Sequence, residues 1–116
     1  MSVVTRVAAL SFLVTIGTFP VPGQARTFGE IVRWCTTSTR PGDDRLCEAY
    51  VSAGLDLFRS PDPVLNAGNR ICPPKGITVK DAIPVLAAWL KRHPESRDEV
   101  AAPVAAAALA EKFPCR

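Results

Sequence analysis

The stretch from residue 43 to residue 59, DDRLCEAYVSAGLDLFR, predicts a long amphipathic helix. Asp43 and Asp44 stand at its start, where carboxylates favour the positive end of the helix dipole. Gly54 lies on the apolar face and costs about 1 kcal/mol relative to alanine, so we expect another helix to cross closely there. The apolar residues recur three and four positions apart, as one helix face requires: Cys47, Tyr50, Val51, Gly54, Leu55 and Phe58.

A first helix is predicted before this stretch, from about Phe28 to Thr37. Thr27 is a suitable N-cap, and Glu30 three residues later completes the pattern of a capping box. Pro41 and Gly42 then mark a turn into the second helix. The apolar stripe of the first helix consists of Phe28, Ile31, Val32 and Cys35.

Two more helices are predicted after a long loop at residues 60–76, which contains four prolines. The third helix begins at Thr78, with Asp81 as its capping partner, and ends before Pro94. Pro84 lies past its first turn and removes one helix hydrogen bond, so we expect a kink or a first turn that is not α-helical. The fourth helix covers roughly Ala101–Lys112. Since no alternating strand pattern occurs, we predict an all-α fold, a small four-helix bundle.

Four cysteines predict two disulfides that staple this bundle. Cys35 ends the first helix and Cys47 begins the second, so two antiparallel neighbours would bring them together. Cys72 precedes the third helix and Cys115 follows the fourth, which favours a second pair. Three connectivities are possible, and helix geometry favours Cys35–Cys47 with Cys72–Cys115. Zinc is a weaker interpretation because the cysteines lack the close pairs that zinc sites use.

The N-terminal residues 1–25 read as a signal peptide, which leaves residues 26–116 as the mature domain. Arg6 supplies the positive n-region, and an uncharged apolar stretch runs from Val7 to Phe19. Gly23 and Ala25 place small residues before the expected cut. A membrane anchor needs roughly 20 apolar residues, and Pro20 interrupts this run. We therefore expect a periplasmic protein with no membrane association after cleavage.

Charge and composition argue against several other classes of protein. The net charge is only +3, and no run of lysines or arginines occurs, so the sequence does not predict nucleic-acid binding. The single histidine, His93, has no cysteine or serine partner that the sequence indicates for catalysis. No glycine-rich phosphate loop occurs. We therefore expect a protein that is not an enzyme and holds no cofactor or metal.

Several short motifs, in order, resemble the Rap/Tai family of immunity proteins. They are Trp34-Cys35, then Cys47 with Tyr50 and Gly54, then residues 71–78 (ICPPKGIT), Leu90 followed by His93-Pro94-Glu95, and Phe113-Pro114-Cys115. The resemblance covers most of residues 28–115. It implies a small helical bundle that is periplasmic and often dimeric. It also implies a partner, a peptidoglycan amidase effector of type VI secretion, whose active-site cleft the immunity protein occludes.

The loop between Pro61 and Lys75 is the segment we expect to enter such a cleft. Its candidate polar contacts are Asp62, Asn66, Asn69 and Arg70. A solvated loop with no partner is the simpler interpretation. The alternative function is that of a general periplasmic stress protein, similar to small helical acid chaperones, which would expose apolar surface at low pH.

Overall fold

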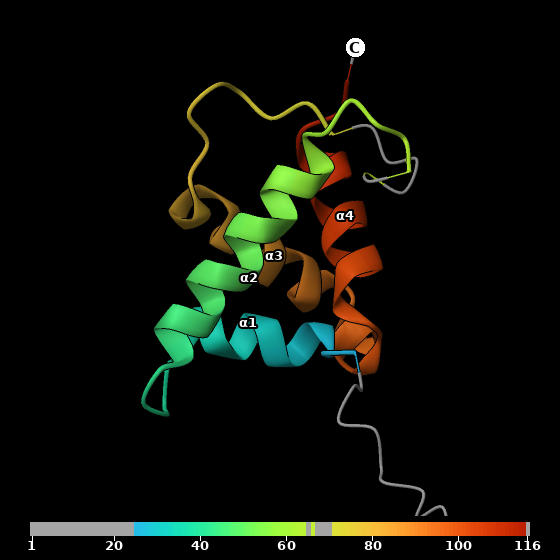
Figure 1. The fold of residues 1–116 in the computed structure, drawn as a ribbon. Helices are drawn as coiled ribbons and strands as arrows, with labels where there is room; N and C mark the ends of the chain where they lie inside the picture. Colours follow the sequence, from blue (N-terminus) through green and yellow to red (C-terminus); the bar gives the residue numbers. More distant parts are fainter. Residues whose placement is uncertain (1–24, 65, 67–70, 116) are drawn as a thin grey trace, which may run out of the picture.

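The computed structural model describes residues 25–64, 66 and 71–115, and these form four α-helices and one short 3₁₀ helix (Figure 1). The elements are α1 (Phe28–Thr36), α2 (Asp43–Phe58), α3 (Val79–Arg92), η1 (Pro94–Asp98) and α4 (Ala101–Lys112). No strand occurs within the described ranges, where two isolated antiparallel bridges join Thr27 to Val100 and Ile71 to Pro114. The predicted all-α class is confirmed.

The predicted signal peptide falls on residues 1–24, which lie outside the described residues, and on Ala25. The four α-helices of the described part are too short or too polar to span a membrane.

The core is built on α1, which crosses the base of the bundle beneath α2 and α4, with α3 behind them (Figure 1). Phe28 and Ile31 of α1 are fully buried, with 0% and 1% of their surface exposed. The α1 helix packs on the three other α-helices, and α3 packs on α2 and α4. The α2 and α4 helices make little direct contact, which leaves a hollow between them.

The two N-caps predicted for α1 and α3 both form, but only one capping box is complete. At α3 the Thr78 hydroxyl accepts from the Asp81 N–H, and the Asp81 carboxylate accepts from the Thr78 N–H at 2.9 Å. The bonds that the Thr78 N–H and the Thr78 hydroxyl donate to the Asp81 carboxylate lower the pKa of Asp81 below its ordinary value. At α1, Thr27 caps the Glu30 N–H, but the Glu30 carboxylate pairs with Arg26 instead. The predicted capping box of α1 is therefore half formed.

Pro84 does not disturb the start of α3 as expected. The helix is α-helical from Val79 onward and continues through Pro84 to Arg92. The capping box holds the first turn, and the proline ring is exposed on the helix surface, so its missing N–H removes one bond locally. The predicted non-helical first turn is wrong.

Gly54 is not the site of a helix crossing within this chain, so that prediction is wrong as well. A Cβ at Gly54 would meet only the Phe58 ring, at 3.7 Å. The close approach occurs at Gly29 of α1, where a Cβ would lie 2.6 Å from Arg97 Cγ and 2.9 Å from the Arg97 carbonyl oxygen. The η1 backbone therefore occupies the space that a side chain at residue 29 would need.

Candidate functional site

Two disulfides hold the ends of the helices together. Cys35 at the end of α1 is bonded to Cys47 at the start of α2, with their Cα atoms 5.1 Å apart. Cys72 is bonded to Cys115 beyond α4, with a Cα separation of 4.9 Å. These are the two pairs that the helix ends favour. The first fixes the angle between α1 and α2, and the second fixes the segment before α3 to the end of α4.

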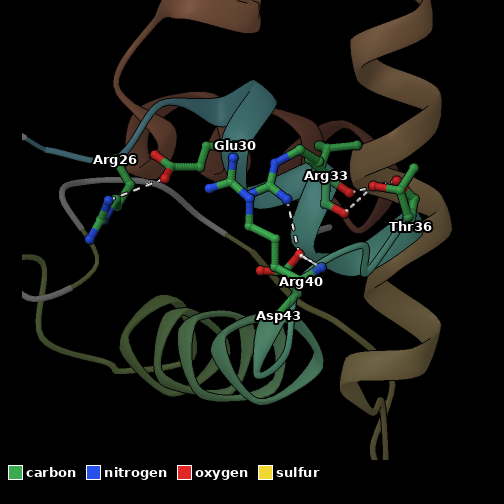
Figure 2. Close-up of polar contacts among 8 residues, drawn as sticks. Arg26, Glu30, Arg33, Thr36, Arg40 and Asp43 are labelled. Carbon is green, nitrogen blue, oxygen red and sulfur yellow. Dashed lines mark hydrogen bonds and ion pairs between the residues drawn. The ribbon is translucent and has the colours of Figure 1, made fainter.

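A partly buried ion pair reinforces the turn between α1 and α2 (Figure 2). Arg33 Nη1 donates to Asp43 Oδ2 at 2.9 Å, and the Arg40 N–H donates to the same oxygen at 3.1 Å. Asp43 is only 3% exposed, so its charge is compensated by these donors. Gly42, which precedes it, has a left-handed φ of 88° that the turn requires. The ion pair and the Cys35–Cys47 bridge therefore fix the end of α1 to the start of α2.

At the opposite end, the long loop is closed at its base by bonds to both sides. Arg59 Nη2, just after α2, donates to the Ile77 carbonyl oxygen at 3.0 Å, across 18 residues of chain. The Cys72 N–H donates to the Phe113 carbonyl oxygen at 2.8 Å, next to the disulfide. The loop therefore leaves and rejoins a fixed frame made of α2, α3 and α4.

The first part of this loop, residues 60–64 and 66, is a tight turn held by its own polar groups. Asp62 Oδ1 accepts from the Val64 N–H at 2.8 Å, and the Ser60 hydroxyl accepts from the Asp62 N–H at 3.1 Å. Asn66 donates its side-chain amide to the Ser60 carbonyl oxygen at 2.9 Å. Pro61 and Pro63 restrict the backbone further. These bonds within the turn pre-organise it.

Val64 projects from this turn with 83% of its surface exposed. Leu46, Leu57 and Val100, the other large apolar residues that stand out to solvent in the described part, are only about half exposed. Sequence reasoning missed Val64 because it searched the loop for polar contacts. A valine that directly follows Pro61-Asp62-Pro63 in a loop is the signal that could have found it.

The predicted polar contacts divide into two groups. Asp62 and Asn66 lie in the turn, where their side chains bond to the loop backbone. Asn69 and Arg70 lie outside the described residues. As contacts to a partner, these four residues stay a prediction.

A second surface is the apolar hollow between α2 and α4, with a volume of about 310 Å³. Burial raises the pKa of Tyr50, which stands at its edge, above the ordinary value of 10.0. The buried floor comprises Ile31, Val51, Leu55, Leu86 and Leu109, and the walls include Tyr50, Gly54, Leu57, Ala102 and Ala105.

A family model of the Rap1a immunity proteins matches residues 27–115, which is nearly the whole described chain. The chain belongs to the Rap1a immunity protein family. The match includes all four helices, both disulfides and the long loop. No curated protein and no solved structure matches the chain.

As a Rap1a protein, the chain is an immunity protein that acts against a secreted effector. Immunity proteins of this family are typically not enzymes. Their action is therefore expected to depend on the surfaces that contact a partner and not on reactive side chains. His93 stacks on Trp89 with ring centroids 4.3 Å apart, and its Nδ1 lies 3.3 Å from a Glu95 carboxylate oxygen. Within the described ranges, no three metal-ligating side chains gather. The loop and the hollow are therefore the surfaces on which a partner has to be sought.

Proposed function

We propose that this protein is a periplasmic immunity protein that binds a peptidoglycan amidase delivered by type VI secretion. The loop segment between Pro61 and Lys75 enters the active-site cleft of the amidase and blocks access to its substrate. Inhibition is steric and involves no chemical step. The N-terminal signal peptide brings the protein to the compartment in which such an effector arrives.

The observation that supports this proposal is the pre-organised turn on a tethered loop. A loop that is ordered before binding loses less conformational entropy in the complex, and this raises affinity. Arg59 and the Cys72–Cys115 bridge fix the base of the loop, and the bonds of Asp62 fix its first turn. A pre-organised turn at the start of a tethered loop is well suited to enter a cleft.

Val64, at the tip of the turn, indicates that the loop meets an apolar part of the cleft. Val64 offers an apolar side chain with little entropy to lose, since valine has one rotatable side-chain bond. Its solvent exposure of 83% makes its burial in a complex favourable. Asp62, Asn66, Asn69 and Arg70 are the proposed polar contacts around it.

Binding and inhibition can be tested with the oxidised mature protein, residues 26–116. Its affinity is measured by calorimetry against a set of purified type VI peptidoglycan amidases, and hydrolysis of peptidoglycan fragments is followed in parallel. We expect tight binding and inhibition of one cognate amidase. Binding to many unfolded proteins only in acid would contradict this proposal and support the acid chaperone alternative.

The contribution of the loop is tested by Val64→Asp, for which Val100→Asp is the matched control. Val100 is 50% exposed and lies at the start of α4, at the other end of the bundle from the loop (Figure 1). We expect Val64→Asp to weaken amidase binding by about tenfold or more, which is about 1.4 kcal/mol. Equal effects of the two substitutions would show that the loop tip is not in the interface.

We also propose that the protein forms a homodimer, as its family resemblance implies. Sedimentation velocity of the mature protein over a range of concentrations measures this directly.

A further inference from the structure

The α2 helix carries a second apolar stripe that the chain itself leaves uncovered. Leu46, Tyr50, Ala53 and Leu57 recur at intervals of four, three and four residues, which places them along one face. Leu46 and Leu57 are 47% and 46% exposed. The stripe that packs into the core is a different one, formed by Cys47, Val51 and Leu55. A helix with two neighbouring apolar stripes has buried only one of them.

This second stripe borders the hollow between α2 and α4. Small residues line both sides of the opening: Gly54 on α2, and Ala102 and Ala105 on α4. A helix interior glycine costs about 1 kcal/mol relative to alanine, and among the described residues a Cβ placed at Gly54 would meet only the Phe58 ring. Small side chains let the backbone of another helix come close. The hollow therefore leaves room for a helix of another molecule to pack against α2 and α4.

Charges along the edge of the same stripe indicate which helix fits. Arg45 and Asp56 are exposed and lie 11 residues apart, so they share one edge of α2 at a separation of about 16 Å along the axis. Neither forms an ion pair within the described part of the chain. When two copies of a helix pack antiparallel about a two-fold axis, equivalent edges face each other. Arg45 of one copy then meets Asp56 of the other, and this happens twice.

We infer that the α2 stripe and the adjoining hollow are the surface at which a second copy of this chain docks, with the two α2 helices antiparallel. Two Arg45–Asp56 ion pairs set the register, in which each copy places Leu46 against the hollow of the other, beside Leu55. A two-fold interface buries the same patch on both copies, and homodimer interfaces are typically more apolar than the remaining surface. This inference rests on the proposed homodimer and names its interface.

Apolar contact is tested first, by sedimentation of the oxidised mature protein carrying Leu57→Glu. We expect its dimer dissociation constant to rise by at least about tenfold. Val100→Glu is the matched control, since Val100 is similarly exposed and lies outside the stripe. Circular dichroism confirms that both exposed variants keep their helices. A dissociation constant that responds equally to the two substitutions would overturn the inferred surface.

Charge pairing provides the decisive test. Arg45→Asp places two carboxylates opposite each other at both ends of the interface, and Asp56→Arg places two guanidinium groups there. We expect each variant alone to be about tenfold weaker as a dimer. An equimolar mixture of the two variants should form a heterodimer, because both pairs are then complementary again, and the double variant R45D/D56R should dimerise as the original does.

The outcomes separate the inference from the proposals on which it rests. A wild-type protein that stays monomeric at every concentration would refute both the homodimer and this interface. If the dimer dissociation constant is the same for all three charge variants and the original protein, the homodimer stands and only the α2 interface is refuted. Amidase binding is measured separately and is not decided by either result.

Discussion

The two disulfides should contribute unequally to stability because they close loops of very different length. Cys35 and Cys47 are separated by 12 residues, whereas Cys72 and Cys115 are separated by 43. A cross-link removes conformational entropy from the unfolded chain, and the loss grows with the logarithm of the loop length. This relation gives about 3 kcal/mol for the shorter loop and about 4 kcal/mol for the longer one. We predict that the Cys72–Cys115 bridge stabilises the fold by about 1 kcal/mol more.

Each bridge can be isolated by removing the other with paired cysteine-to-alanine substitutions. Urea unfolding of each variant is compared between its oxidised and reduced forms, so that only the remaining bridge changes. Sucrose keeps the reduced forms folded by its exclusion from the protein surface. C35A/C47A should lose about 4 kcal/mol on reduction and C72A/C115A about 3 kcal/mol. The reverse order would refute the entropic reasoning and show that the reduced chain keeps structure between residues 72 and 115.

Three further predictions concern single side chains. Gly29→Ala should lower the free energy of unfolding by about 1–3 kcal/mol, because its Cβ would collide with the η1 backbone. Gly54→Ala should raise the free energy of unfolding by up to about 1 kcal/mol. Equal melting temperatures of the two variants would contradict this prediction. Asp43→Ala should cost about 2 kcal/mol, since it strips the charged and backbone donors of their acceptor, and exposed Asp44→Ala should change the urea midpoint little. For Asp81, an NMR titration should give a pKa below 3.8, and removal of the capping hydroxyl should raise it; the stabilisation from this carboxylate is present above pH 3.8 and is lost as the pH falls through its lowered pKa.

The helices were predictable because their signals are local. Periodic apolar residues and N-caps act within a few turns, and so the bounds of α2 and α4 agree with the sequence to within one residue. The disulfide pairing followed from the same information, since Cys35 and Cys47 flank the turn between α1 and α2, and Cys72 and Cys115 flank the pair α3 and α4. The described residues of the loop also lie outside the α-helices as predicted, because its prolines disfavour helix there.

The features that the sequence did not reveal depend on what lies opposite a residue in the folded chain. Gly54 was expected beneath a crossing helix, yet the close crossing occurs at Gly29, where η1 follows α3 and folds back over α1. A glycine on an apolar stripe has the same local pattern in either case. Likewise, the sequence does not reveal that the Asp62 carboxylate accepts from the Val64 N–H or that Val64 stands out to solvent. The role of Asp62 as a partner contact stays a prediction.

The two proposed surfaces adjoin each other, since one lies on α2 and the other is the loop that follows α2, and their placement determines whether both can bind at the same time. The uncovered stripe runs from Leu46 to Leu57, and the loop begins one turn further along the chain. A helix of 16 residues is about 24 Å long, so antiparallel pairing of two α2 helices sends the two loops to opposite ends of the dimer. Neither loop is then covered by the second copy, and each can meet its own effector. Substitutions at Val64 should therefore leave dimerisation unchanged, and substitutions at Arg45 should leave the affinity of one loop for one amidase unchanged.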